Sequence, residues 1–219
     1  MAPPAPSSVA RIGFRSGVAA CTAALAYDAV QILQVLGVLR FPVDEILIFG
    51  TSLCIIVPFV LEMLAWHHAT GQETRFWTHA ALIFTTAYAV FGSANYVIQL
   101  TTVIPAKLHG TLAPFQALEQ TPHSLLWDFD ALAYLAMGAA LLLLVPSLER
   151  SGVERWARWS CLGNGVATAL AGVVYFSPAF SQATLMLGLP WAVTAPLTML
   201  LLAVALRGKP HGGGPPPEA

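Results

Sequence analysis

Six apolar stretches, each long enough to cross a lipid bilayer, dominate the sequence. A transmembrane helix needs about 20 mostly apolar residues. The stretches that meet this length are 17–38, 46–66, 77–104, 124–146, 157–177 and 183–206. A helix pairs its own backbone polar groups, which the hydrocarbon core of a bilayer requires of a spanning segment. We therefore predict an all-α fold, a polytopic transmembrane helix bundle with six spans.

The composition excludes a water-soluble domain and a nucleic-acid-binding protein. Apolar residues make up 57% of the 219 residues and charged residues only 10%, with a mean hydropathy of +0.69. Soluble domains contain roughly 25% charged residues, and a chain this short cannot bury so much apolar surface. The formal net charge is −1, so no excess of basic residues is available to neutralise phosphates.

The two ends differ from the rest of the chain. Residues 1–16 and 207–219 contain runs of Pro, Gly and Ser without apolar periodicity, which is typical of disordered tails. No stretch between them has the composition of a linker. We therefore expect one transmembrane domain over 17–206, flanked by two disordered tails.

The distribution of basic residues predicts the orientation of the bundle. With six spans, both ends and two of the loops lie on one side of the membrane, and this side carries eight of the ten Lys and Arg residues. Loops that are rich in Lys and Arg stay in the cytoplasm. We therefore predict cytoplasmic termini in a multi-pass protein of the bacterial inner (plasma) membrane, with membrane lipids as its immediate partners.

Ionisable side chains within the spans are the first candidates for function. A charged side chain at the bilayer centre costs about 3 kcal/mol by insertion scales, so it faces the bundle interior or a wet cavity. Asp28 lies near the centre of its span, and Asp130 lies about 7–8 Å towards the outer face. We assign these two as candidate catalytic residues. Glu62 lies apart on the cytoplasmic side, and Asp128 points about 160° away from Asp130 as a solvated first-turn residue.

Neutral polar and aromatic residues share the outer layer with Asp130. Asn95 and Gln99 follow one polar face of the third span, and Asn95 has the depth of Asp130, so we expect these two side chains to meet. Such a face either joins helices by hydrogen bonds or lines a cavity in which aromatic rings stabilise a cation. The cavity interpretation assigns ligand binding to Asn95, Tyr96, Gln99, Gln31, Trp127, Tyr134 and Trp191. For the face of the fifth span with Asn164 and Tyr175, we favour packing.

Prolines and one long loop affect the shape of this layer. Pro58, Pro190 and Pro196 are expected to kink their helices and to open space near the midplane. The loop 105–123 is either a short amphipathic lid over the outer mouth or a plain surface loop.

No motif in the sequence indicates a cofactor or a metal. The six histidines lack the spacing that places ligands on one helix face. No Lys lies within a span, which excludes a retinal Schiff base. We therefore predict no cofactor and no metal site.

Two segments carry a resemblance to known proteins. At residues 95–101 (NYVIQLT) and 122–127 (PHSLLW), leading to Tyr134 and Gly138, the chain resembles bacterial six-helix integral membrane proteins of unassigned function. The resemblance implies a six-helix fold and nothing about activity. In general character the chain is also similar to membrane sterol isomerases and integral-membrane terpene cyclases. No motif matches either family residue by residue, so no catalytic role is carried over.

Three classes of function are compatible with these features. The first is an enzyme that performs acid–base chemistry, of the isomerase or cyclase type, on a lipophilic small molecule. The second is a small-molecule or proton-coupled transporter, although the prolines of the two halves do not correspond as inverted repeats would. The third is an accessory or scaffold subunit. We favour a cavity for a hydrophobic small molecule, and the oligomeric state stays open.

Overall fold

The computed structural model describes residues 8–178 and 180–209, except for the side chain of Gln182. This part of the chain contains helices and no strands. The helices are α1 (Ser8–Val35), α2 (Val43–Ala69), α3 (Arg75–Ile98), α4 (Ile104–Leu108), α5 (Leu125–Leu144), α6 (Gly152–Phe176), α7 (Gln182–Leu185) and α8 (Leu189–Arg207). A π-helical turn, Gln99–Val103, joins α3 to α4. Six of the helical segments are long and apolar enough to cross a membrane, so the predicted all-α fold with six candidate spans is confirmed.

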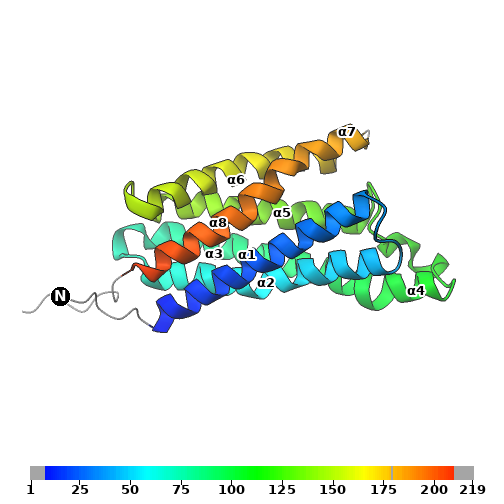
Figure 1. Cartoon of the computed structure of the whole chain (residues 1–219), viewed down its shortest axis with the longest axis horizontal. Coiled ribbons are helices and arrows are strands. Elements are labelled where there is room, and N and C mark those ends of the chain that lie inside the picture. The colour runs from blue at the N-terminus through cyan, green and yellow to red at the C-terminus, as the bar shows by residue number, and fades with distance from the viewer. Residues whose placement is uncertain (1–7, 179, 210–219) are drawn as a thin grey trace, which may run out of the picture.

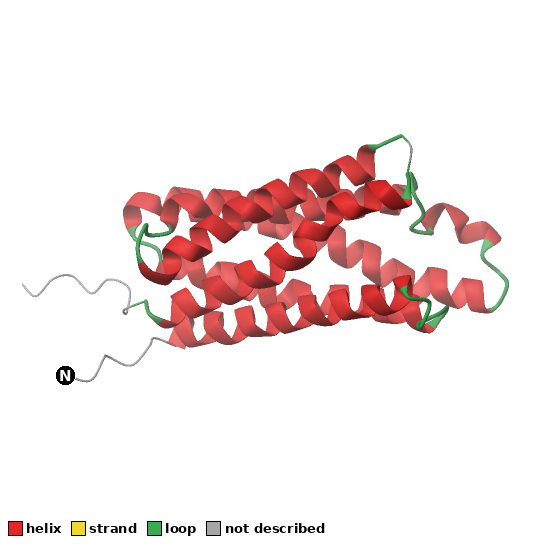
Figure 2. Cartoon of the chain, turned by 45° about the horizontal axis from the view of Figure 1, so that its top comes forward, coloured by secondary structure: helices red, strands yellow, loops and turns green. Residues whose placement is uncertain are grey.

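The six long helices form a closed ring. Each packs against its neighbours in the chain, in the order α1, α2, α3, α5, α6 and α8, and α8 packs back against α1. Figure 1 shows them side by side along the long axis of the molecule, and Figure 2 shows the same arrangement after a turn. Successive long helices run antiparallel, as in an up-and-down bundle.

The loops and short helices that connect the long helices lie at two opposite ends of the bundle. The start of α1 and the end of α8 lie together with the α2–α3 and α5–α6 loops (Figure 1). The opposite end carries α4, α7 and the α1–α2 loop, and we call it the α4 end. Its α1–α2 loop turns at Gly37, whose φ of 69° lies in the left-handed region, which a glycine adopts at no steric cost.

The bundle exposes large apolar side chains and buries several polar ones within a mainly apolar core. Large apolar side chains such as Ile83, Val166 and Val193 are exposed, whereas Asn95 and Asn164 are fully buried. In a soluble protein large aliphatic side chains are most often buried and Asn is mostly exposed. Lipid solvates apolar side chains, and interhelical hydrogen bonds satisfy the buried amides. The arrangement therefore fits an integral, multi-pass membrane protein.

The expectation of a disordered tail over residues 1–16 is wrong for residues 8–16, which begin α1. The cause is close helix packing. A Cβ atom at Gly13 would lie 2.5 Å from Cβ of Ala65 and 2.7 Å from Cδ1 of Leu206, so glycine lets α1 approach α2 and α8. Tail residues 1–7 and 210–219 lie outside the described residues.

The prolines act differently from one another. Pro58 and Pro196 lie inside α2 and α8, as expected. Pro190 lies in the first turn of α8, where the helix leaves backbone N–H groups unpaired in any case and proline fits without distortion. The interruption of this span lies directly before Pro190, at the 3-10 turn Met186–Gly188.

Candidate functional site

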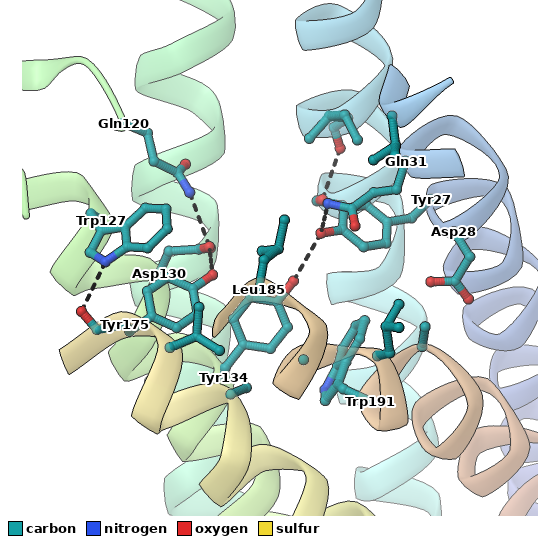
Figure 3. Close-up of a pocket in the computed structure, with 18 of the residues that line it drawn as sticks. Tyr27, Asp28, Gln31, Gln120, Trp127, Asp130, Tyr134, Tyr175, Leu185 and Trp191 are labelled. Carbon is teal, nitrogen blue, oxygen red and sulfur yellow. Dashed lines mark hydrogen bonds between the residues drawn. The ribbon is translucent and has the colours of Figure 1, made fainter. Parts of the chain in front are cut away.

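A cavity of about 260 Å³ lies in the half of the bundle that ends at α4. All six long helices contribute to its wall, together with α7 and the turn after it. Figure 3 shows its aromatic side chains and the two carboxylates of Asp28 and Asp130. We call it the aromatic cavity. Its volume is close to the lower end of small-molecule sites, roughly 300–1,000 Å³.

Asp130 lies at the wall of the aromatic cavity and accepts hydrogen bonds from four side chains. Its Oδ1 accepts one from the hydroxyl of Tyr96 at 2.9 Å and one from Nδ2 of Asn95 at 3.4 Å. Its Oδ2 accepts one from Nε2 of Gln120 at 3.0 Å and a short one from the hydroxyl of Tyr175. The side chain is only 4% exposed. This site therefore supplies the donors that a carboxylate removed from water requires.

The four donors come from three separate elements. Asn95 and Tyr96 are neighbours on α3, Tyr175 lies near the end of α6, and Gln120 belongs to the loop that precedes α5. Asp130 itself lies near the start of α5, where the hydroxyl of the N-cap residue Ser124 accepts from a backbone N–H. The site thus depends on the packing of α3 and α6 against α5 and on the position of one loop.

A chain of amide hydrogen bonds holds that loop against α3. Nε2 of Gln99 donates to the carbonyl of Leu118 at 2.7 Å, and the backbone N–H of Gln120 donates to Oε1 of Gln99 at 3.4 Å. Nδ2 of Asn95 donates to Oε1 of Gln120 at 2.8 Å. The loop 105–123 is thus docked on the site through Gln120, which also lines the aromatic cavity.

The opposite wall of the cavity is built from aromatic rings of α1, α5 and α8. The ring of Trp191 meets the ring of Tyr134 at 4.8 Å and that of Tyr27 at 6.1 Å, both nearly perpendicular. The hydroxyl of Tyr27 accepts from Nε2 of Gln31 at 2.8 Å and from the hydroxyl of Tyr134 at 3.3 Å. These bonds and edge-to-face contacts fix the rings.

Two polar groups of this cavity lack a partner among the described residues. Asp28 lines the cavity half-buried and takes part in no hydrogen bond or ion pair, and Figure 3 shows no dashed line at its carboxylate. The indole Nε1 of Trp191 is buried and has no acceptor. A ligand in the cavity can supply the partner that the carboxylate of Asp28 lacks, because a polar group removed from water gains free energy when it is paired.

The structure brings together most of the predicted site residues. Asp130, Asp28, Tyr96, Gln31, Trp127, Tyr134 and Trp191 all line the aromatic cavity. Asn95 does not line it, but its contact with Asp130 confirms the expected meeting of the two side chains. Gln99 lines a second cavity of about 170 Å³, together with Lys107 and other polar residues. Asp128 is exposed on the other face of α5, as predicted.

Three residues of the site, Gln120, Tyr175 and Tyr27, were not assigned to it from the sequence. Tyr175 shares a helix face with Asn164, and we attributed that face to packing. Asn164 does bond across helices, to Thr194 of α8 at 3.2 Å, whereas Tyr175 points to Asp130. For Gln120, the neighbouring prolines of the loop gave no signal that its side chain turns inward.

Glu62 forms a separate feature in the other half of the bundle. It is fully buried, and neither carboxylate oxygen has a hydrogen-bond partner in the part of the chain that the structure describes. The carboxyl group occupies the space beside Gly17 of α1 and lies next to Ala203 of α8. It lines neither of the two cavities.

Within the described residues, no group of three or more His, Cys, Asp or Glu side chains is arranged to hold a metal ion. Comparison with known proteins adds no assignment. No protein-family model matches the chain, and neither a curated protein nor a solved structure matches it. The resemblance at residues 95–101 and 122–127 stays a prediction.

Proposed function

We propose that this protein binds a lipophilic small molecule in the aromatic cavity and performs acid–base chemistry on it. It does so in the bacterial plasma membrane, with both termini in the cytoplasm and the α4 end facing outwards. The observation that carries the proposal is the position of Asp130. Its carboxyl group lies at the wall of a cavity large enough for a small molecule and is held by two phenols and two amides.

The geometry supports a proton-transfer role for this carboxyl group. In such a step a C–H bond of the ligand breaks, its proton forms an O–H bond to the Asp130 carboxylate, and the electron pair stays on the ligand. The hydroxyls of Tyr96 and Tyr175 and the two amides hold the carboxylate in one orientation, which favours transfer at a fixed place in the cavity. Return of the proton from Asp130 to a different carbon atom of the ligand completes an isomerisation.

A scaffold subunit explains less of this arrangement. Helix association needs hydrogen bonds between helices, as Asn164 forms with Thr194, and it does not need a cavity. In the half of the bundle near α4, polar side chains such as Asp130 and Gln120 lie at the wall of a cavity.

The experiment compares lipid and metabolite extracts from cells that express the native protein, Asp130→Asn or the control Asp128→Asn at matched folded yield. Asp128 is exposed on the opposite face of α5, so the control carries the same chemical change outside the cavity. We expect the amount of at least one compound in the extracts of the native and control strains to differ from its amount in the extract of the Asp130→Asn strain. A redistributed but unaltered compound would indicate transport. Identical extracts from all three strains would refute the proposal.

A further inference from the structure

The charges of the aromatic cavity are unbalanced. Two carboxylates, Asp28 and Asp130, line it, and no Lys, Arg or His is among the described residues of its wall. The carboxylate of Asp130 accepts hydrogen bonds from four side chains, whereas the carboxylate of Asp28 accepts none from the described residues. Because α1 begins at Ser8, Asp28 lies about 10 Å from the midpoint of that helix, towards the α4 end, and the expected position near the centre of the span is wrong. A carboxylate without a partner is nevertheless costly within a membrane span. The wall therefore presents one uncompensated acidic group to whatever occupies the cavity.

The aromatic side chains of the same wall favour a positive charge as well. Trp191 is 6% exposed and lies edge-to-face with Tyr27 and Tyr134, so its ring is held in place. Tyr27 and Asp28 are adjacent on α1, which puts an acidic group and this aromatic cluster on neighbouring parts of the wall (Figure 3). Aromatic faces attract cations within about 6 Å of the ring centroid, most strongly where water is excluded.

The neighbouring polar cavity offers no site for an anion. Its only basic residue among the described wall residues is Lys107. Nζ of Lys107 pairs with Glu45 at 2.6 Å and with Glu119 at 3.0 Å. Two carboxylates thus already surround this ammonium group. An anionic ligand would meet uncompensated negative charge in both cavities.

We propose that the ligand of the aromatic cavity is a lipophilic organic cation of the amine class, whose charge lies between the carboxylate of Asp28 and the aromatic faces around Trp191. This inference rests on the proposed function, because it names the ligand of the same cavity. The amine supplies the counter-charge that Asp28 lacks.

The test uses two probes of equal shape and different charge. Benzyltrimethylammonium is a permanent cation, and neopentylbenzene is its neutral isostere. Saturable binding of each is measured by calorimetry to the full chain in phosphatidylcholine nanodiscs, with empty nanodiscs as the reference for partition into lipid. Phenylmethanesulfonate serves as the anionic probe. The variants are Asp28→Asn, the control Asp128→Asn and Ala192→Phe, which fills the cavity from α8.

We expect the cation to bind about tenfold or more tightly than the neutral isostere, and the anion not to bind. Asp28→Asn should remove this preference while Asp128→Asn keeps it, and Ala192→Phe should abolish binding of both probes. Equal binding of the two isosteres to the native protein would overturn the inference and leave the proposed function standing. A preference that persists in folded Asp28→Asn would also overturn it. Absence of saturable binding, or binding unaffected by Ala192→Phe, would refute the proposed function and the inference together.

Discussion

The side-chain amide of Gln120 donates a hydrogen bond of 3.0 Å to Oδ2 of Asp130, although Gln120 belongs to a loop and Asp130 to a transmembrane helix. The same amide accepts a hydrogen bond from Asn95 at 2.8 Å. The loop between α4 and α5 is therefore part of the site and not only a connection. A change in this loop acts directly on the carboxyl group that we place at the centre of the chemistry.

Replacement of Gln120 by Leu should lower the free energy of unfolding by about 1–3 kcal/mol, because it removes a donor from Asp130 and an acceptor from Asn95, both of which are buried. Reversible unfolding of the protein in mixed detergent micelles measures this difference. Gln116→Leu is the matched control, since Gln116 is exposed in the same loop, and it should change stability by at most about 0.5 kcal/mol. Equal effects of the two variants would show that the amide network contributes nothing.

Close packing of α5 on α6 should make Gly138→Ala destabilising by about 1–3 kcal/mol. A Cβ atom at Gly138 would lie 2.6–2.7 Å from three atoms of Thr168. At Gly163, by contrast, the added atom would meet only Cγ2 of Thr194 at 3.9 Å. Gly163→Ala should therefore be neutral or stabilising by up to about 1 kcal/mol, the helix propensity of Ala over Gly. Unfolding midpoints in detergent compare the two, and a destabilised Gly163→Ala would contradict the packing of α6 described above.

Glu62 should be dispensable for folding. Its buried carboxyl group has no partner, so Glu62→Met removes an unsatisfied polar group at similar volume and should stabilise the fold by about 1–3 kcal/mol. Glu73→Met, at an exposed position between α2 and α3, is the control and should have little effect. Loss of the folded protein on Glu62→Met alone would mean that Glu62 holds a structural partner.

The orientation of the bundle can be tested by reporter fusions. Fusions after residues 5 and 212 should report the cytoplasm, and a fusion near Gly110 should report the outer side. The reason is that eight of the ten Lys and Arg residues lie on the side of the termini and only two on the opposite side, and loops rich in these residues stay in the cytoplasm. In the structure, the start of α1 and the end of α8 lie at the same end of the bundle (Figure 1). An external reporter at residue 212 would reverse the orientation that we propose.

The spans could be predicted from the sequence because length and hydropathy alone decide which segments cross a bilayer. The start of α1 could not. Arg11 and Arg15 make its first turns polar, and only the fold shows that Ala10 and Gly13 on the other face are buried and that Gly13 packs against α2 and α8.

The contact between Asn95 and Asp130 could be predicted because equal depth on consecutive antiparallel spans is a local property of the sequence. The contribution of Tyr175 could not be predicted in this way. The helical period gives the direction of a side chain relative to its own helix, but not which neighbouring helix lies there. The contribution of Gln120 is harder still to predict, since the course of its loop depends on hydrogen bonds to Gln99, which lies 21 residues away in the sequence.

The central claim is that the aromatic cavity holds a small molecule, and native mass spectrometry of the purified protein after incubation with a cell extract tests it most directly. Ala192→Phe places a ring inside the cavity, and the matched variant Ala26→Phe places one on the exposed face of α1. We predict one tightly bound small molecule per chain in the native protein and in Ala26→Phe, and none in Ala192→Phe. A bound molecule retained by Ala192→Phe, or absent from the native protein, would contradict the account.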